Sequence, residues 1–160
     1  MDTNETQAEH FQQWAGSNFL YAAQSKGNLG KRMLDALNDV FTVGYGQAII
    51  IGTDIPNLTA EILTLAFQLL DQSDVVIGPT FDGGYYLIGM RKVHSEIFAN
   101  IAWSTPVVMM QTLQAVADLR LSISILPTLM DIDTEEDLRQ WLTTSPTPNH
   151  FQDLLTIIEK

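Results

Sequence analysis

Asp54 is the carboxylate whose position in this sequence most directly suggests chemistry. It lies in the run 52–58 (GTDIPNL), directly after the apolar, β-branched stretch 47–51 (QAIII), which predicts a buried strand. Open α/β sheets bind ligands beyond the carboxyl ends of their strands, where a carboxylate can hold a divalent metal against a phosphate-bearing substrate. The alternative is an Asp that only closes the turn before Pro56.

A glycine pair marks the second candidate segment, 78–86 (GPTFDGGYY). Gly83 and Gly84 have no side chains, so their backbone N–H groups can approach a ligand closely. Asp82 could bind a metal or a sugar hydroxyl, and Tyr85 could stack on a ring. The alternative is that Asp-Gly-Gly only forms a hairpin turn.

The third candidate segment is Trp103-Ser104-Thr105. Ser104, or the N-terminus of a helix that starts there, could face an anionic ligand. The alternative is a buried Trp beside an ordinary helix cap.

Two acids two residues apart define the fourth candidate segment, 131–134 (DIDT). On an extended stretch Asp131 and Asp133 point to the same side, so they could share a metal. Asp131 could instead complete a site begun by Asp54. The alternative for Asp133 is a helix cap, with Glu136 three residues later giving a start like a capping box.

Other chemistry-bearing residues give weaker signals. His10, His94 and His150 have no ligand spacing, and we interpret them as surface residues. The loop 25–31 (SKGNLGK) resembles a phosphate cradle but lacks the Walker spacing, so it is interpreted as a loop that could touch a ligand.

Strand and helix patterns alternate along the chain, which indicates an α/β fold with a mainly parallel sheet. We divide the sequence into a polar N-terminal segment, 1–18, and a single domain, 19–160. The predicted strands are 19–24, 47–52, 74–78, 85–89 and 122–126. The predicted helices are 31–42, 59–71 capped by Thr59, 105–119 starting at Ser104, and one that begins at Asp133.

The composition is that of a folded globular protein. A chain of 160 residues fits one domain, and 46% hydrophobic against 17% charged residues argues against disorder. With no Cys, disulfides, thiolate metal sites and a cysteine nucleophile are excluded. Neither a membrane-spanning run nor a signal-peptide core is found, so we expect a cytoplasmic protein without a membrane partner.

The formal net charge is −11, from 19 acids and 8 bases. Such a field repels polyanions, so we expect no nucleic-acid partner. A small phosphorylated ligand remains compatible with it, because a bound divalent cation can be the largest local charge.

Taken together, five segments resemble the glycosyltransferase-A-like family associated with arsenosugar biosynthesis, long catalogued as a domain of unknown function. The resemblance covers about residues 20–142. That family is akin to nucleotidyltransferases that make molybdenum-cofactor dinucleotides and phospholactate–guanosine conjugates. The resemblance implies a nucleotide-diphospho-sugar transferase (GT-A) fold, a three-layer α/β/α sandwich with a central mixed sheet. The segments are 24–33 (QSKGNLGKRM), 52–58, 78–89, 103–105 and 129–138 (LMDIDTEEDL).

The chain departs from the family pattern in two places. The family's first strand and the Gly/Lys/Arg-rich loop after it have no counterpart, which implies an N-terminally shortened domain. Asn28 stands where the family usually has Asp. A shortened sheet bares an edge and apolar helix faces, so we expect the protein to form a homodimer.

The resemblance implies a metal-dependent glycosyltransferase or nucleotidyltransferase that acts on a nucleotide or nucleotide-sugar donor. Asp54 and Asp131 would hold Mg²⁺ or Mn²⁺ against the diphosphate, with Asp54 and Asp82 as the catalytic residues. The alternatives are a non-catalytic family remnant that binds a small molecule or serves as a dimerising module, and a fold without any ligand site. The predicted substrate-binding residues are Gly83, Gly84, Tyr85, Trp103, Ser104 and Thr105.

Overall fold

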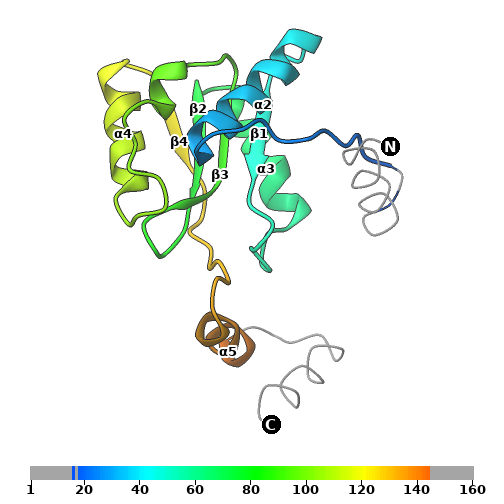
Figure 1. Cartoon of the computed structure of the whole chain (residues 1–160), viewed down its shortest axis with the longest axis vertical. Coiled ribbons are helices and arrows are strands. Elements are labelled where there is room, and N and C mark those ends of the chain that lie inside the picture. Colours follow the sequence, from blue (N-terminus) through cyan, green and yellow to red (C-terminus); the bar gives the residue numbers. More distant parts are fainter. Residues whose placement is uncertain (1–15, 17, 145–160) are drawn as a thin grey trace.

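The architecture is seen in a computed structural model, which describes residue 16 and residues 18–144 (Figure 1). Most of the predicted N-terminal segment 1–18, together with His10 and His150, lies outside the described residues. Among the described helices, none is long and apolar enough to cross a membrane.

Eight of the nine predicted elements are found, with bounds that differ from prediction by at most three residues. The predicted strand at 19–24 is wrong: these residues form an irregular, mostly exposed segment that pairs with none of the described strands. A strand needs a neighbour for its backbone groups, and none of the described strands supplies one to residues 19–24. The helices are α2 (Leu29–Val43), α3 (Ala60–Leu70), α4 (Val108–Asp118) and α5 (Glu135–Thr144), with an unpredicted 3₁₀ helix η1 (Ser95–Phe98). The strands are β1 (Ala48–Ile51), β2 (Val75–Pro79), β3 (Tyr85–Met90) and β4 (Ile123–Ile125).

The four strands form one mixed sheet in the order β1-β3-β2-β4. β3 pairs antiparallel with both β1 and β2, and β4 pairs parallel with β2. The prediction of a mainly parallel sheet is therefore wrong, because only residues 80–84 separate β2 from β3, and a link this short joins antiparallel strands. It follows that β1, β2 and β4 run in one direction and end at the same edge, where β3 begins.

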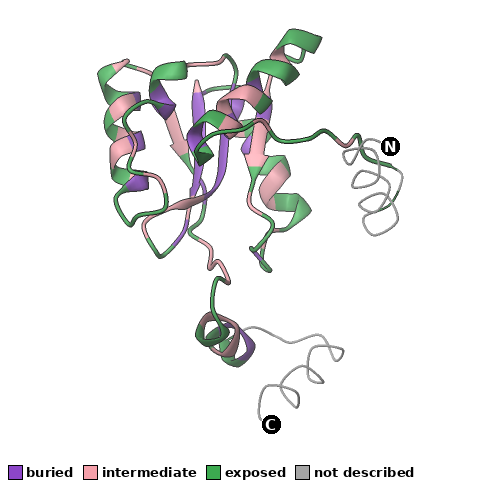
Figure 2. Ribbon diagram, viewed as in Figure 1, coloured by how far each residue is buried: buried purple, intermediate pink, exposed green. Residues whose placement is uncertain are grey.

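Helices cover both faces of the sheet, which gives the three-layer α/β/α sandwich (Figure 1). α2, η1 and α4 pack on one face and α3 on the other, with the most deeply buried residues on the strands between them (Figure 2). The first core cluster contains Met33, Leu37, Ala48, Val75, Ile77, Ile88, Met90, Ile97, Phe98 and Val116. The second contains Ile55, Ala66, Leu70, Val76, Tyr86, Leu87 and Leu126.

A β-bulge interrupts the alternation of side chains at the start of β3. Gly78 pairs with Leu87 and Pro79 with Tyr85, so Tyr86 is the extra residue. Tyr85 therefore joins the core on the α2 side, while Tyr86 packs on the α3 side. The Tyr86 ring lies over Gly78, where an added Cβ would come within 2.3 Å of Cζ. Bulges commonly re-aim side chains in this way near functional sites.

Candidate functional site

Three loops meet at the edge where β1, β2 and β4 end. The N–H of Ile132 donates to the carbonyl oxygen of Asp54 at 3.0 Å, which joins the loop after β4 to the loop after β1. The N–H of Leu129 donates to Pro79 O at 3.1 Å, which joins the loop after β4 to the end of β2. The sheet thus brings together acids that are far apart in sequence, as the strand-end argument predicts.

Asp82, Asp131 and Asp133 form the acid cluster of this edge. One carboxylate oxygen from each lies within 4.8 Å of the other two; Asp131 is half-buried and its two neighbours are exposed. This spacing suits a shared hard cation such as Mg²⁺ or Mn²⁺, which takes oxygen ligands. Asp54 is not part of this group of three, although its charge acts on Asp131.

The environment of Asp131 favours its protonated form. Burial is the largest cause that raises the pKa of this carboxyl group, followed by the nearby charges of Asp82, Asp133 and Asp54. Like charges this close repel one another, and a bound divalent cation would reverse that effect.

The Asp-Gly-Gly turn fixes the position of Asp82. Its Oδ1 accepts hydrogen bonds from Thr80 Oγ1 at 2.5 Å and from Gly84 N at 2.9 Å. The amide of Gly84 thus closes the turn. Gly83 has a left-handed φ of 92°, and its carbonyl oxygen accepts from Met109 N at 2.9 Å. Gly83 therefore has a clear conformational role, and the amide of Gly84 belongs to the same turn, which agrees with the hairpin-turn alternative.

Asp54 folds back over the glycine that precedes it. A Cβ at Gly52 would lie 2.8 Å from Asp54 Oδ1, so the absence of a side chain there leaves room for the carboxylate. Gly52 N in turn donates to Tyr86 O at 2.8 Å, which ties this loop to β3. Asp54 itself is exposed.

A cavity of about 620 Å³ lies beside these loops, between α2 and the strands β1 and β3. Asp54, Asp131 and Tyr85 line it, whereas the other predicted site residues are not among its lining residues. Sequence reasoning missed its α2 wall, which contains Arg32 and Asp39. Their seven-residue spacing, two helical turns, is the signal that could have found them.

Trp103 packs into the protein interior. Its ring stacks on Phe98 at 6.4 Å between centroids and meets the ring of Tyr85 edge-on at 6.5 Å. It also lies against Gly30 of α2, where an added Cβ would come within 2.4 Å of the indole. The observed contacts of Trp103 are thus structural, and a substrate contact stays a prediction.

Ser104 does not start a helix, so that prediction is wrong. α4 begins at Val108, while Ser104 has a left-handed φ of 61° that takes the chain out of any helix. The hydroxyl of Thr105 donates to Ala102 O at 2.6 Å, within its own turn. No helix begins at Ser104 or Thr105, so a ligand bound by these residues would not be stabilised by a helix N-terminus there.

The hydroxyl of Tyr85 is buried. Within residues 18–144 it has no hydrogen-bond partner, and neither has the hydroxyl of Thr112. Burial raises the pKa of Tyr85 well above the usual range, and the nearby Thr112 hydroxyl offsets part of this without reaching hydrogen-bond geometry. Tyr85 therefore stays a neutral phenol, with its ring edge against Trp103.

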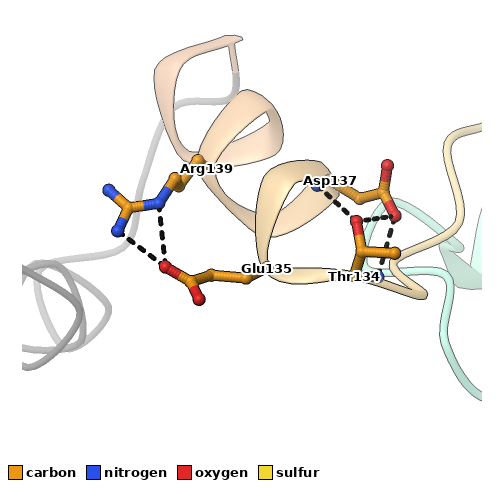
Figure 3. Close-up of polar contacts among 4 residues, drawn as sticks. All are labelled: Thr134, Glu135, Asp137 and Arg139. Atoms are coloured by element: carbon orange, nitrogen blue, oxygen red, sulfur yellow. Dashed lines mark hydrogen bonds and ion pairs between the residues drawn. The ribbon is translucent and has the colours of Figure 1, made fainter.

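The capping box of α5 lies one residue later than predicted (Figure 3). Thr134 Oγ1 accepts from Asp137 N at 3.2 Å and donates to Asp137 Oδ2 at 2.7 Å, so the box is Thr134–Asp137 and not Asp133–Glu136. The reciprocal bond of the box comes from the backbone, since Thr134 N donates to Asp137 Oδ2 at 2.8 Å. The hydrogen bonds from Thr134 lower the pKa of Asp137. The Asp133 carboxylate therefore does not cap α5 and belongs to the acid cluster.

The loop before α2 borders the cavity. Asn28 is the N-cap of α2, and its Oδ1 accepts from Lys31 N at 2.9 Å. Gln24 and Ser25 line the cavity, so this loop lies where the sequence places a possible ligand contact. His94 is half-buried, precedes η1 and does not line the cavity.

Comparisons with known proteins agree with this architecture. The sequence profile of the family described as "Uncharacterized protein conserved in bacteria (DUF2064)" matches residues 1–105. A comparison with proteins of curated function finds no match. The chain is similar to a crystal structure from Desulfovibrio desulfuricans G20 described as a "putative nucleotide-diphospho-sugar transferase", with 35% identity and a TM-score of 0.84. The likeness covers 95% of this chain and 65% of that one, so this chain spans just under two thirds of that relative's length.

Proposed function

The chain belongs to the DUF2064 family of bacterial proteins, and from its fold and its acid cluster we propose that it is a metal-dependent, glycosyltransferase-like or nucleotidyltransferase-like protein. Its donor would be a nucleotide or nucleotide-sugar. The fold shared with a protein described as a nucleotide-diphospho-sugar transferase supports a glycosyltransferase-like role in general. The kinship with arsenosugar-associated and molybdenum-cofactor enzymes is a finer proposal that rests on sequence resemblance alone.

One observation carries the proposal: acids from three separate loops meet at a single sheet edge beside a cavity. Clustered carboxylates repel one another, and a divalent cation would relieve this repulsion while attracting a diphosphate. In a chain of net charge −11, such a cation would offset the repulsion between the protein and a polyanionic donor. Mg²⁺ or Mn²⁺ suits all-oxygen ligands.

We assign the metal to Asp131, with Asp54 on the cavity side and Asp82 and Asp133 completing the oxygen ligands. Bound there, the metal would neutralise charge that develops on the leaving group. Asp82 is held in place by Thr80 and Gly84, as preorganised electrostatic stabilisation requires. Gly83, Gly84 and Tyr85 would then shape the acceptor side mainly by fixing the loop around Asp82.

Thermal denaturation with nucleotides and nucleotide-sugars, each with and without Mn²⁺, tests the proposal. We expect a rise in Tm that requires both metal and nucleotide, because binding to the folded state stabilises it. Asp131→Asn should abolish the rise, while the control Asp118→Asn, on the exposed end of α4, should keep it. A cooperative transition that no combination shifts would overturn the proposal and favour a non-catalytic family remnant.

A further inference from the structure

Arg32 is the single basic side chain among the described residues that line the cavity. Four carboxylates line it too: Asp54 and Asp131 belong to the loops, and Asp35 and Asp39 lie on α2 with Arg32. In the described part of the chain, no ion pair joins Arg32 to any of them. Asp35 pairs instead with Lys31, at 2.7 Å. The charge of Arg32 is therefore not neutralised by a direct contact.

The guanidinium group of Arg32 is oriented but incompletely hydrogen-bonded. Its Nη1 donates to Gln24 Oε1 at 2.8 Å, which fixes one side of the group. Its Nε is buried and has no acceptor among the described residues. A buried charged donor without an acceptor costs free energy, so its presence calls for an explanation.

The geometry of an arginine side chain suggests that explanation. The edge formed by Nε and Nη2 presents two parallel N–H groups, which match the two oxygens of a carboxylate or phosphate. The Gln24 contact uses Nη1 and leaves this edge without a partner in the described part of the chain. An oxyanion that reached this edge would remove the cost of the unsatisfied Nε–H.

We propose that Arg32 is the metal-independent anion anchor of the cavity and binds a phosphate or carboxylate group of the ligand. The inference rests on the proposed function only in placing that ligand in the same cavity. The acids need a cation before they can hold an anion, whereas Arg32 binds one directly. The ligand would thus carry a second anionic group, apart from any group held through the metal.

Titration of the full chain with inorganic phosphate and, separately, with acetate tests this proposal in a metal-free buffer containing EDTA. The readout is the NMR signal of the Arg32 Nε–H, assigned by its loss in the variant Arg32→Gln. We expect phosphate, acetate or both to shift this signal saturably, and the stronger of the two identifies the group that is recognised. Affinity, followed through backbone amide shifts of residues 24–33, should fall at least about tenfold in Arg32→Gln.

Two further variants separate anion binding from a merely structural role. Arg32→Lys keeps the charge but loses the paired donors, so it should bind several-fold more weakly than wild type. Arg120→Gln, which removes an exposed arginine after α4, should bind as wild type does. Unfolding curves without ligand identify any variant that fails to fold. The shift of the Nε–H signal in the wild-type protein tests the proposal even if a variant does not fold.

Equal affinity of wild type and Arg32→Gln for phosphate and acetate, or no saturable shift of the wild-type signal, would overturn the proposal that Arg32 binds the anion. The outcome is separate from that of the proposed function, because no metal is present.

Discussion

The backbone of Ile132 donates a hydrogen bond to the backbone of Asp54 at 3.0 Å, and this bond joins two loops that are 78 positions apart in the sequence. Because the contact is between main chains, it holds the loops in register whatever the state of the carboxylates. The repulsion among Asp54, Asp82, Asp131 and Asp133 is therefore opposed by backbone structure. Such preorganisation is what a cation site needs, since its ligands are already gathered.

Gly83→Ala should destabilise the protein by about 2 kcal/mol or more, because φ is 92° and the new Cβ would meet Pro106 O at 2.1 Å. Gly46→Ala is the matched control, since it has open space and no left-handed φ. Urea unfolding measures both variants. Equal stability of the two would show that the turn before β3 does not depend on Gly83.

Asp74→Asn should destabilise the fold by about 0.5 to 1 kcal/mol at pH 7, because solvent weakens the hydrogen bonds at this half-buried site. The Asp74 carboxylate accepts from Ser122 N at 2.9 Å and from Ser122 Oγ at 2.6 Å, joining the starts of β2 and β4. These bonds lower its pKa. A lowered pKa gives stability that is present above the unfolded value of about 3.9 and is lost as the pH falls through the folded value. Urea unfolding from pH 7 to pH 2 should thus show the two proteins converging in acid; a constant difference would contradict this account.

Tyr85→Phe should leave stability unchanged or raise it by up to about 1 kcal/mol, since it removes a buried hydroxyl that has no partner. Tyr86→Phe is the comparison, because the Tyr86 hydroxyl donates to Pro127 O at 3.0 Å and its loss should cost about 1 kcal/mol. Thermal unfolding of both variants measures the difference. A larger loss of stability in Tyr85→Phe than in Tyr86→Phe would contradict the finding that the Tyr85 hydroxyl makes no hydrogen bond within the described residues.

β1 forms one end of the described sheet and has no neighbour on its outer side. Ile51 at its end is 41% exposed, and Val43 and Tyr45 before it are more exposed still. We therefore predict a dimer that pairs along β1, and Ile51→Lys should make it a monomer. Light scattering after size-exclusion chromatography measures the mass; a wild-type monomer would contradict the prediction.

Much of the fold could be predicted because the periodicity of apolar residues marks its helices and strands, and Gly, Pro and capping residues mark their ends. Thr59 caps α3 as expected, and the carboxyl-end rule brought Asp54 and Asp131 to one edge. What could not be predicted depends on tertiary context. The bulge at Tyr86 reverses which face Tyr85 occupies, and strand direction follows from pairing that no local pattern records. Segment 19–24 has strand-like residues but pairs with none of the strands that the structure describes.

The candidate site shows the same division between local and long-range information. A one-residue shift of the capping box turns Asp133 from a helix cap into a member of the acid cluster, and both registers satisfy the sequence spacing. Trp103 is a predicted substrate-binding residue, and its ring packs on Phe98, as the alternative of a buried Trp expects. Arg32 faces the cavity only because α2 packs beside β1.

Direct titration of Mn²⁺ into wild type, Asp131→Asn and the control Asp118→Asn, by calorimetry at pH 7, tests the central claim most directly. We predict that the control binds as wild type does and that Asp131→Asn binds at least about tenfold more weakly. Wild-type affinity should also fall as the pH is lowered through the raised pKa of Asp131, because the protonated carboxyl is a poor ligand. Equal Mn²⁺ affinity in all three proteins, or none in any, would contradict a metal site at this edge of the sheet.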